Sequence, residues 1–451
     1  MIPPHADRRR CSFAAREARC PFLLALVGAA LVVGAVAPAA AGPALSFSRA
    51  VLYGAGSDAQ ALALGDVNGD GRLDMATVEF NASDVVVLLN TGRGRFDRGA
   101  AFNTGEFPGN VAIGDLNADG LGDLVTTGAF GTNVSVLLSR GDAGFLPHRE
   151  FRTGSEPSSI AIADLNGDGK ADLATANRAA SSMSVLLNKG DGTFLPKVDY
   201  RTGNGPNEVA RGDVNGDGRP DLVTADHGGL SLFLNRGDGS FLPRHRYQTG
   251  HSGSGSVAVG DVNGDRKPDL VSAGGGVWVF LGKGDGSFLP RRHYPTGDLG
   301  SVAIGDLTGD GRPDLALGDG GVAVLVNSGG GFEPELDYDS RDETYAVAVG
   351  ELNGDKRLDL AAVNMSSRNG ASSFAVLLNT PGLCDVQYVV DLTLAAAKRA
   401  LARASCRLGR VTRVSSKRVN TGRVVSQKPG FGAVRPKGTK VDLIVSRGAR
   451  R

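Results

Sequence analysis

Short apolar runs separated by polar turns dominate the chain between residues 45 and 380. The runs are four to seven residues long, rich in β-branched residues, and bounded by Gly, Asn, Asp or Pro, as in "DLATA" at 172–176 and "SVLLN" at 184–188. Such runs are typical of β-strands. No 3.6-residue periodicity is sustained before residue 391, so this region is predicted to be mainly β.

The runs recur in a fixed order. Each unit has one run before an acidic decapeptide, one run after it, a run such as "SVLLN", and a stretch such as "FLPKVDYRTG". The first acidic residues of the seven decapeptides are spaced by 49, 49, 49, 48, 45 and 45 residues. A period of this length indicates a repeat architecture. Four strands in each of seven units predict a seven-bladed β-propeller, with a linear solenoid as the alternative.

The two ends of the repeat region favour the closed ring. The region begins with a strand that resembles the fourth run of a unit, "LSFSRAVLYGAG" at 45–56, and ends on a third run, "FAVLLN" at 374–379. The last unit therefore lacks its fourth strand, and the first strand has no unit. Pairing the two would complete the last blade and cover two exposed strand edges.

The decapeptide has the chemistry of a calcium loop. The first copy, "GDVNGDGRLD" at 65–74, aligns as D-x-N-G-D-G-x-x-D, with side-chain oxygens at positions 1, 3, 5 and 9 and a backbone carbonyl available at position 7. Hard oxygen donors at this spacing, with a glycine for the sharp turn, suit calcium. The simpler reading is a tight Asx-Gly turn. An EF-hand is excluded because position 12, Thr77 in the first copy, is not Glu and the flanks are strands.

The predicted cofactor is calcium, with up to seven ions and weaker occupancy in the last three loops. Those loops depart from the pattern: Arg266 and Lys356 replace the position-6 glycine, Thr308 replaces Asn, and Glu351 replaces Asp. The predicted ligands, with the position-7 residue contributing its carbonyl, are Asp66, Asn68, Asp70, Arg72 and Asp74; Asp115, Asn117, Asp119, Leu121 and Asp123; Asp164, Asn166, Asp168, Lys170 and Asp172; Asp213, Asn215, Asp217, Arg219 and Asp221; Asp261, Asn263, Asp265, Lys267 and Asp269; Asp306, Thr308, Asp310, Arg312 and Asp314; and Glu351, Asn353, Asp355, Arg357 and Asp359.

The N-terminus has the pattern of an export signal. Arginines at 8–10 precede a 16-residue apolar run at 22–37, and Ala39 and Ala41 form an A-x-A cleavage site. An uncleaved anchor is the alternative, and no other segment is long and apolar enough to span a bilayer. The mature chain would keep two cysteines, Cys384 and Cys406, which in an exported protein predict one disulfide.

The C-terminal segment differs in composition from the rest. Residues 384–451 hold 16 Lys and Arg against 3 Asp and Glu, a net charge of +13. "LTLAAAKRALARASC" predicts a helix with Thr393 as its N-cap, and strands are predicted at 409–415, 422–429 and 440–446. Such a basic surface attracts anionic polymers. Because the chain is predicted to be exported, a cell-wall polymer is the expected partner rather than nucleic acid.

Two family resemblances follow from these motifs. "VAVGDVNGDRKPDLVSA" at 257–273 and its siblings resemble FG-GAP/VCBS repeats, the blades of integrin α-subunit propellers, over residues 45–380. "SQKPGFGAVRPKGTKVDLIVSRG" resembles a PASTA domain, a small βαβββ module associated with peptidoglycan recognition, over residues 384–448. We therefore expect a signal peptide at 1–41, a propeller at 42–380, a linker at 381–383, a PASTA-like domain at 384–448 and a basic tail at 449–451.

These resemblances imply a secreted or cell-wall-associated binding or adhesion protein with no catalytic residues, and the sequence does not identify its extracellular protein or glycan ligand. The alternative is a secreted hydrolase or lyase that acts on a polysaccharide or lipid-linked substrate at a propeller face. Fold alone cannot separate the two, because propellers of this kind carry both activities.

Overall fold

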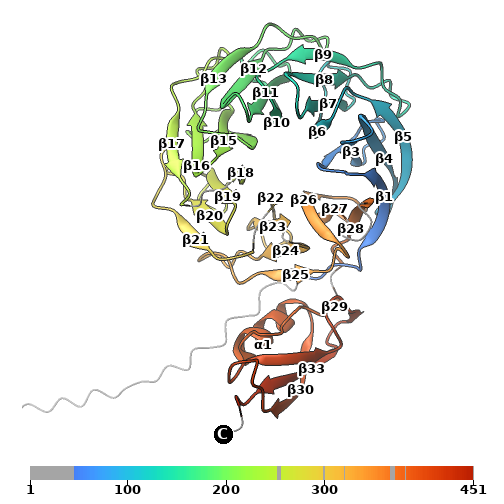
Figure 1. Cartoon of the computed structure of the whole chain (residues 1–451), viewed down its shortest axis with the longest axis vertical. Coiled ribbons are helices and arrows are strands. Elements are labelled where there is room, and N and C mark those ends of the chain that lie inside the picture. The colour runs from blue at the N-terminus through green and yellow to red at the C-terminus, as the bar shows by residue number, and fades with distance from the viewer. Residues whose placement is uncertain are drawn as a thin grey trace, which may run out of the picture. The chain divides into compact units, whose positions relative to one another are not determined.

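The computed structural model describes residues 45–250, 255–297, 300–318, 320–365, 371–380 and 382–449. Seven four-stranded antiparallel sheets stand around a central axis, each with its first strand innermost (Figure 1). The chain is therefore a seven-bladed β-propeller followed by a small α+β domain, which confirms the predicted fold class.

The blades follow one another along the chain. The first four blades are β2–β5 (Ala63–Gly65, Asp74–Glu79, Asp84–Gly92, Arg95–Asn103), β6–β9 (Pro108–Gly114, Asp123–Gly128, Asn133–Leu137, Arg149–Arg152), β10–β13 (Pro157–Ala163, Asp172–Asn177, Ser182–Leu186, Val198–Arg201) and β14–β17 (Glu208–Gly212, Asp221–Asp226, Gly229–Phe233, His245–Gln248). The other three are β18–β21 (Ser256–Gly260, Asp269–Ala273, Val277–Phe280, Arg292–Tyr294), β22–β25 (Ser301–Gly305, Asp314–Gly318, Val322–Leu325, Leu336–Tyr338), and β26–β28 (Glu343–Gly350, Asp359–Met365, Ala371–Leu377) with β1 (Val51–Ser57).

Burial explains which sequence runs became which strands. The second strand of a blade is buried along almost its whole length, and in β15 ("DLVTAD") the apolar or small residues lie between two buried aspartates. The fourth strand lies at the outer rim and is mostly exposed, as in "HRYQ" of β17. The fourth strands are shorter than the sequence predicts, because the preceding "FLP" belongs to a turn in which Phe194 bridges Asn188.

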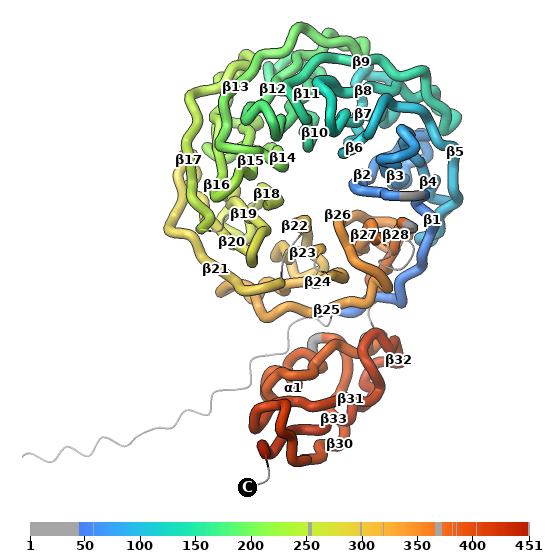
Figure 2. Tube along the Cα trace, in the orientation of Figure 1, coloured from blue at the N-terminus to red at the C-terminus, as the bar shows by residue number. Residues whose placement is uncertain are grey.

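The predicted ring closure is confirmed. β1 pairs antiparallel with β28, with Val51 opposite Val376 and Tyr53 opposite Phe374, and a further bridge joins Phe47 to Asn379 (Figure 2). The seventh blade thus takes its outer strand from the N-terminal end of the described chain. β1 therefore covers the edge of β28, which would otherwise be free.

The C-terminal domain has one helix, α1 (Leu394–Arg403), whose N-cap Thr393 accepts a hydrogen bond from the Ala396 N–H, as predicted. Its strands are β29 (Leu383–Asp385), β30 (Arg407–Val414), β31 (Val424–Lys428), β32 (Val434–Pro436) and β33 (Lys440–Ser446). β30, β33 and β31 form one sheet, and β29 pairs with β32, a short strand that the sequence did not indicate. The predicted disulfide is present between Cys384 and Cys406.

The predicted signal peptide lies outside the described residues. Within the residues that the structure describes, no helix has the length and apolar character needed to cross a membrane.

Candidate metal-binding loops

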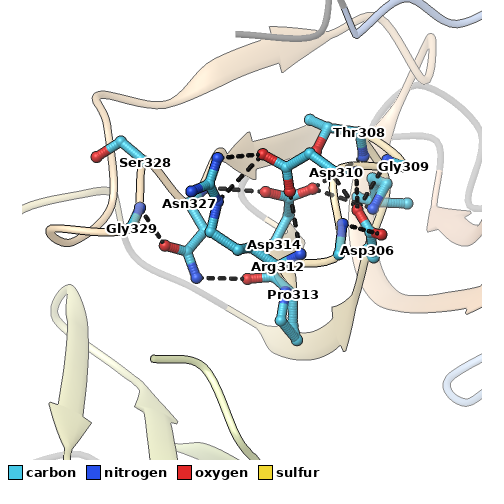
Figure 3. A network of polar contacts seen from close by, with 12 residues as sticks. Asp306, Thr308, Gly309, Asp310, Arg312, Pro313, Asp314, Asn327, Ser328 and Gly329 are labelled. Atoms are coloured by element: carbon cyan, nitrogen blue, oxygen red, sulfur yellow. Dashed lines mark hydrogen bonds and ion pairs between the residues drawn. The ribbon is translucent and has the colours of Figure 1, made fainter. Parts of the chain in front are cut away.

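Each decapeptide forms the hairpin between the first two strands of a blade, and the sixth copy illustrates the arrangement (Figure 3). The Asp306 carboxylate accepts backbone N–H bonds from Gly309 at 2.7 Å and Gly311 at 2.8 Å. Asp310 accepts the backbone N–H of Arg312 at 3.0 Å. Asp310 therefore forms an Asx turn, and Asp306 holds the loop through N–H groups three and five residues on, in addition to both being candidate ligands.

The position-5 carboxylate also pairs with the cation at position 7 in four copies. The shortest nitrogen–oxygen distances are 2.8 Å for Arg312–Asp310, 3.0 Å for Arg72–Asp70 and 3.1 Å for Lys170–Asp168. Partial burial raises the pKa of Asp310, but hydrogen bonds and charge from Arg312 outweigh it and hold that pKa below its usual value. These exposed pairs are worth little on their own.

Position 9 has a different environment. The seven position-9 aspartates are fully buried, and each of their carboxylate oxygens accepts at least one backbone N–H bond. Asp314, for example, accepts from Leu307 and Thr308 on one oxygen, both at 3.0 Å, and from Asn327 on the other at 2.8 Å. The sequence predicted these aspartates only as metal ligands and missed this structural role.

Burial governs the pKa of these aspartates. Burial raises the pKa and the nearby loop carboxylates raise it further, whereas the backbone N–H bonds lower it. The resulting pKa is about 6 for Asp74, Asp123, Asp221, Asp269, Asp314 and Asp359. The pKa of Asp172 is raised for the same reasons.

The loops also join neighbouring blades through an asparagine that the sequence showed but did not explain. This is the last residue of the "VLLN" run, and its side-chain amide donates to two carbonyls. Asn235 donates to Pro220 of its own loop and to Leu165 of the preceding blade's loop, both at 2.9 Å. Asn90 reaches Leu352 of the seventh blade at 3.0 Å, across the ring closure. A position-9 aspartate that accepts the backbone N–H of such an asparagine therefore holds in place a residue that links two blades.

The non-glycine residues at glycine positions keep the loop conformation. Arg266 and Lys356 have φ of 65° and 67°, close to the 83° of Gly311 at the same position. Arg266 donates its N–H to Asp261 at 2.6 Å, as the glycines do. Ala118 at position 4 is a further left-handed residue, with φ of 61°. A left-handed backbone conformation is strained for residues other than glycine, but these loops keep the same turn.

The donor set fits calcium. Four side-chain oxygens and a carbonyl within nine residues match its preference for hard oxygen ligands. An ionised carboxylate has about four lone-pair sites, so a position-9 aspartate that accepts two N–H bonds retains capacity for a cation. In the described part of the chain, however, no three Asp, Glu, His or Cys side chains converge as a ready-made metal group. In the four copies with an ion pair, cation binding would also require the position-5 carboxylate to leave its Arg or Lys partner.

Comparison with protein families decides the classification. The FG-GAP-like repeat matches six overlapping stretches: 66–126, 115–175, 164–224, 213–272, 261–317 and 306–362. The chain belongs to the FG-GAP-like repeat family. A PASTA domain matches residues 385–447. Both resemblances noted in the sequence are thus confirmed, and FG-GAP-like repeats together with a PASTA domain point to an extracellular or cell-surface protein.

Solved structures show the same fold at low identity. The chain is similar to BBS1N from its complex with ARL6DN soaked with lead, with 13% identity, a TM-score of 0.53, and coverage of 74% of this chain and 98% of that chain. It is also similar to a lectin of Agrocybe aegerita that recognises non-reducing terminal N-acetylglucosamine, with 20% identity, a TM-score of 0.47, and coverage of 65% and 91%.

Removing a position-9 aspartate should destabilise the propeller even without calcium. Asp221→Ala would leave the buried N–H groups of Val214 and Asn235 unpaired, at a cost of about 1–3 kcal/mol for each donor. Asp217→Ala removes an exposed partner of Arg219 and should cost less than about 1 kcal/mol. Urea unfolding of both variants in chelator measures the difference. Equal costs would show that position 9 has no structural role of its own.

The raised pKa values predict an unusual pH dependence. The position-9 aspartates have a pKa of about 6 in the folded state, against about 4 in the unfolded chain. The folded state therefore binds more protons than the unfolded state between about pH 4 and pH 6. In chelator, the free energy of unfolding should therefore increase by about 1 kcal/mol per carboxyl as the pH falls from 7 to 5. The same contribution should be lost when the pH rises through about 6. With calcium the trend should reverse, because protons compete with the ion. Thermal melts at pH 5 and 7, with calcium and with chelator, test this, and parallel curves would contradict it.

Proposed function

We propose that this protein is a secreted, wall-associated binding protein whose propeller is held by calcium and whose PASTA domain contacts peptidoglycan. Both families found here are typically non-catalytic, and the proposed role is accordingly binding without catalysis. The single observation that carries the proposal is the union of the two modules in one chain, an acidic repeat region followed by a strongly basic PASTA domain.

Calcium would be held by the side chains at positions 1, 3, 5 and 9 and the carbonyl at position 7 of each loop. The ion would supply positive charge to carboxylates that otherwise repel one another. It would also link the loop to the position-9 aspartate, which accepts the backbone N–H of the asparagine that contacts the neighbouring blade. The protein's own contribution is the prearranged turn, which the position-1 carboxylate already closes.

The PASTA domain offers two kinds of contact to a wall polymer. Several basic side chains are exposed on it, among them Arg410, Arg413, Lys417 and Arg418. Tyr388 and Phe431 are 50% and 38% exposed and form an edge-to-face pair with ring centroids 5.9 Å apart. An exposed aromatic pair on so small a domain is suited to stacking against a sugar ring or a peptide, whereas the cations give general attraction to anionic polymer.

Sedimentation of the full-length protein with purified peptidoglycan across a salt series tests the proposal. Charge attraction is screened beyond about 3 Å at 1 M salt, so retention there reports specific contact. We expect retention at 1 M salt for the wild type and its loss in Tyr388→Ala/Phe431→Ala. The matched control, Lys417→Gln/Arg418→Gln, should weaken retention only at low salt.

Loss of all retention at moderate salt would reduce the interaction to electrostatics and contradict specific wall recognition. No retention at any salt would leave the PASTA domain as a cap or spacer.

A further inference from the structure

The end of the propeller opposite the decapeptide loops carries a cluster of three phenylalanines, two of them exposed. In an antiparallel blade, the connection from the second to the third strand and the connection to the next blade both lie at this end. Phe80 and Phe130 follow β3 and β7, and Phe107 lies between β5 and β6. The three ring centroids lie 5.5, 5.6 and 5.7 Å apart. Phe107 and Phe130 remain 39% and 70% exposed.

These phenylalanines are departures from the repeat. The positions equivalent to Phe107 in the next two inter-blade connections are Glu156 and Gly205, and all three have φ between 51° and 53°. Phe130 corresponds to Ala179 in the third blade. A bulky residue in the left-handed region is strained, and exposed aromatic side chains cost solubility. The repeat can evidently be built without the rings, so the fold does not explain the cluster.

A pocket of about 500 Å³ adjoins the cluster, and Phe107 and Phe130 form part of its wall. This volume is within the range of about 300–1,000 Å³ typical of small-molecule sites. The rest of the wall is rich in hydroxyl, amide and carboxylate groups, and its polar side chains include those of Glu106, Thr127, Thr132, Asn133, Ser135 and Glu150.

The polar groups of the wall that a ligand can reach include those of Asn133 and Glu150, because Glu150 is exposed and Asn133 half-buried. The hydroxyl of Thr127 makes no hydrogen bond within the described residues, but it is fully buried and lies out of reach of a ligand. The pocket thus combines exposed phenylalanine rings with accessible amide and carboxylate groups.

The lining narrows the chemistry of the ligand. None of the residues that line the described pocket is Lys, Arg or His, so nothing there would neutralise a phosphate, sulfate or uronate. The rings touch one another, so they cannot form a cage around a quaternary ammonium group between them. A hydrophobic peptide would leave the polar wall unpaired. A pyranose presents both a C–H face for a phenylalanine and hydroxyls for the Thr, Asn and Glu side chains.

We propose that this pocket, at the second blade and the connection that leads into it from the first, binds a neutral saccharide, with a sugar ring against Phe107 and Phe130 and hydroxyls bonded to Asn133 and Glu150. The site lies in the propeller and does not depend on calcium binding or on the wall contact of the PASTA domain. It gives the propeller a ligand of its own.

An array of neutral glycans, probed with the full-length protein, tests the proposal. Phe130→Ala and Phe107→Glu introduce residues that the repeat itself uses at these positions, so both variants are expected to fold, as a thermal melt would verify. We expect binding to one or more neutral glycans, reduced at least ten-fold in either variant and weakened in Asn133→Ala. Titration calorimetry with the best glycan gives the fold-change.

Leu195→Ala is the matched control, because Leu195 is 47% exposed and lies in a turn at the opposite end of the third blade. Its affinity should equal that of the wild type. Binding that survives in both phenylalanine variants would place the saccharide elsewhere, for instance on the PASTA domain, and overturn the proposal. No neutral glycan bound, or binding only of an apolar peptide that depends on Phe130, would also overturn it.

Discussion

Chelation of calcium is expected to lower the melting temperature of the propeller by about 10 °C or more. An ion that binds only the folded state adds about 2.7 kcal/mol per loop at a hundred times its Kd. The first four loops keep all the predicted ligand types, so their summed contribution is a large share of the stability of a domain of this size. Because five blades join their loop to the preceding blade's loop through the asparagine that ends the third run, loosening one of these loops should loosen two blades. Calorimetry with calcium and with chelator measures the effect.

Two variants distinguish calcium binding from loop chemistry. With calcium, Asp168→Ala should lower the melting temperature more than Asp355→Ala, because the third loop keeps Asp164 and Gly169 where the seventh has Glu351 and Lys356. In chelator the two variants should be nearly equal. Asp191→Ala removes an acid from the turn between β12 and β13 of the same blade and serves as the control. A melting temperature that calcium does not change would contradict calcium binding and show that the decapeptides act only as structural turns.

Much of the fold could be predicted because the repeat encodes it locally. The alternation of short apolar runs and Asx-Gly turns defines strands and hairpins without reference to distant residues, and repetition fixes the blade number. The pairing of β1 with β28 is a long-range contact, yet it could be predicted because one missing strand and one surplus strand stood at opposite ends. The helix cap at Thr393 was likewise a local signal.

The parts that the sequence did not indicate depend on contacts between blades. Asn90 looks like any other strand-terminal asparagine, and only the ring brings Leu352, 262 residues away, within reach of its amide. Asp74 is buried because its carboxylate accepts the backbone N–H groups of Val67 and Asn90, and residue type alone does not reveal these contacts. Phe80, Phe107 and Phe130 come from three separate connections, and no spacing rule links them. A comparison of equivalent positions across the seven units would have singled them out as exceptions.

Loss of the N-terminal strand is expected to open the ring. Deleting residues 42–56 would remove most of β1 and expose the backbone edge of β28, together with the apolar surface that the missing strand covers. An unpaired, apolar edge strand is a template for association with other chains. We therefore expect aggregation or a broad, non-cooperative melt, measured by light scattering and calorimetry. A soluble protein with an unchanged melt would show that the ring does not need this strand.

A point variant tests the same closure without exposing a strand edge. Phe47 is fully buried and packs edge-to-face on Tyr338 of the sixth blade, with ring centroids 4.8 Å apart. It therefore ties the first described residues to both the sixth and the seventh blades. Phe47→Ala should cost about 3–5 kcal/mol, as for other buried aromatic side chains. Val51→Ala, at a position of β1 that is 45% exposed, should cost almost nothing. Equal effects of the two variants in urea unfolding would contradict a closure held by this packing, since of the two residues Phe47 is the one buried in the core.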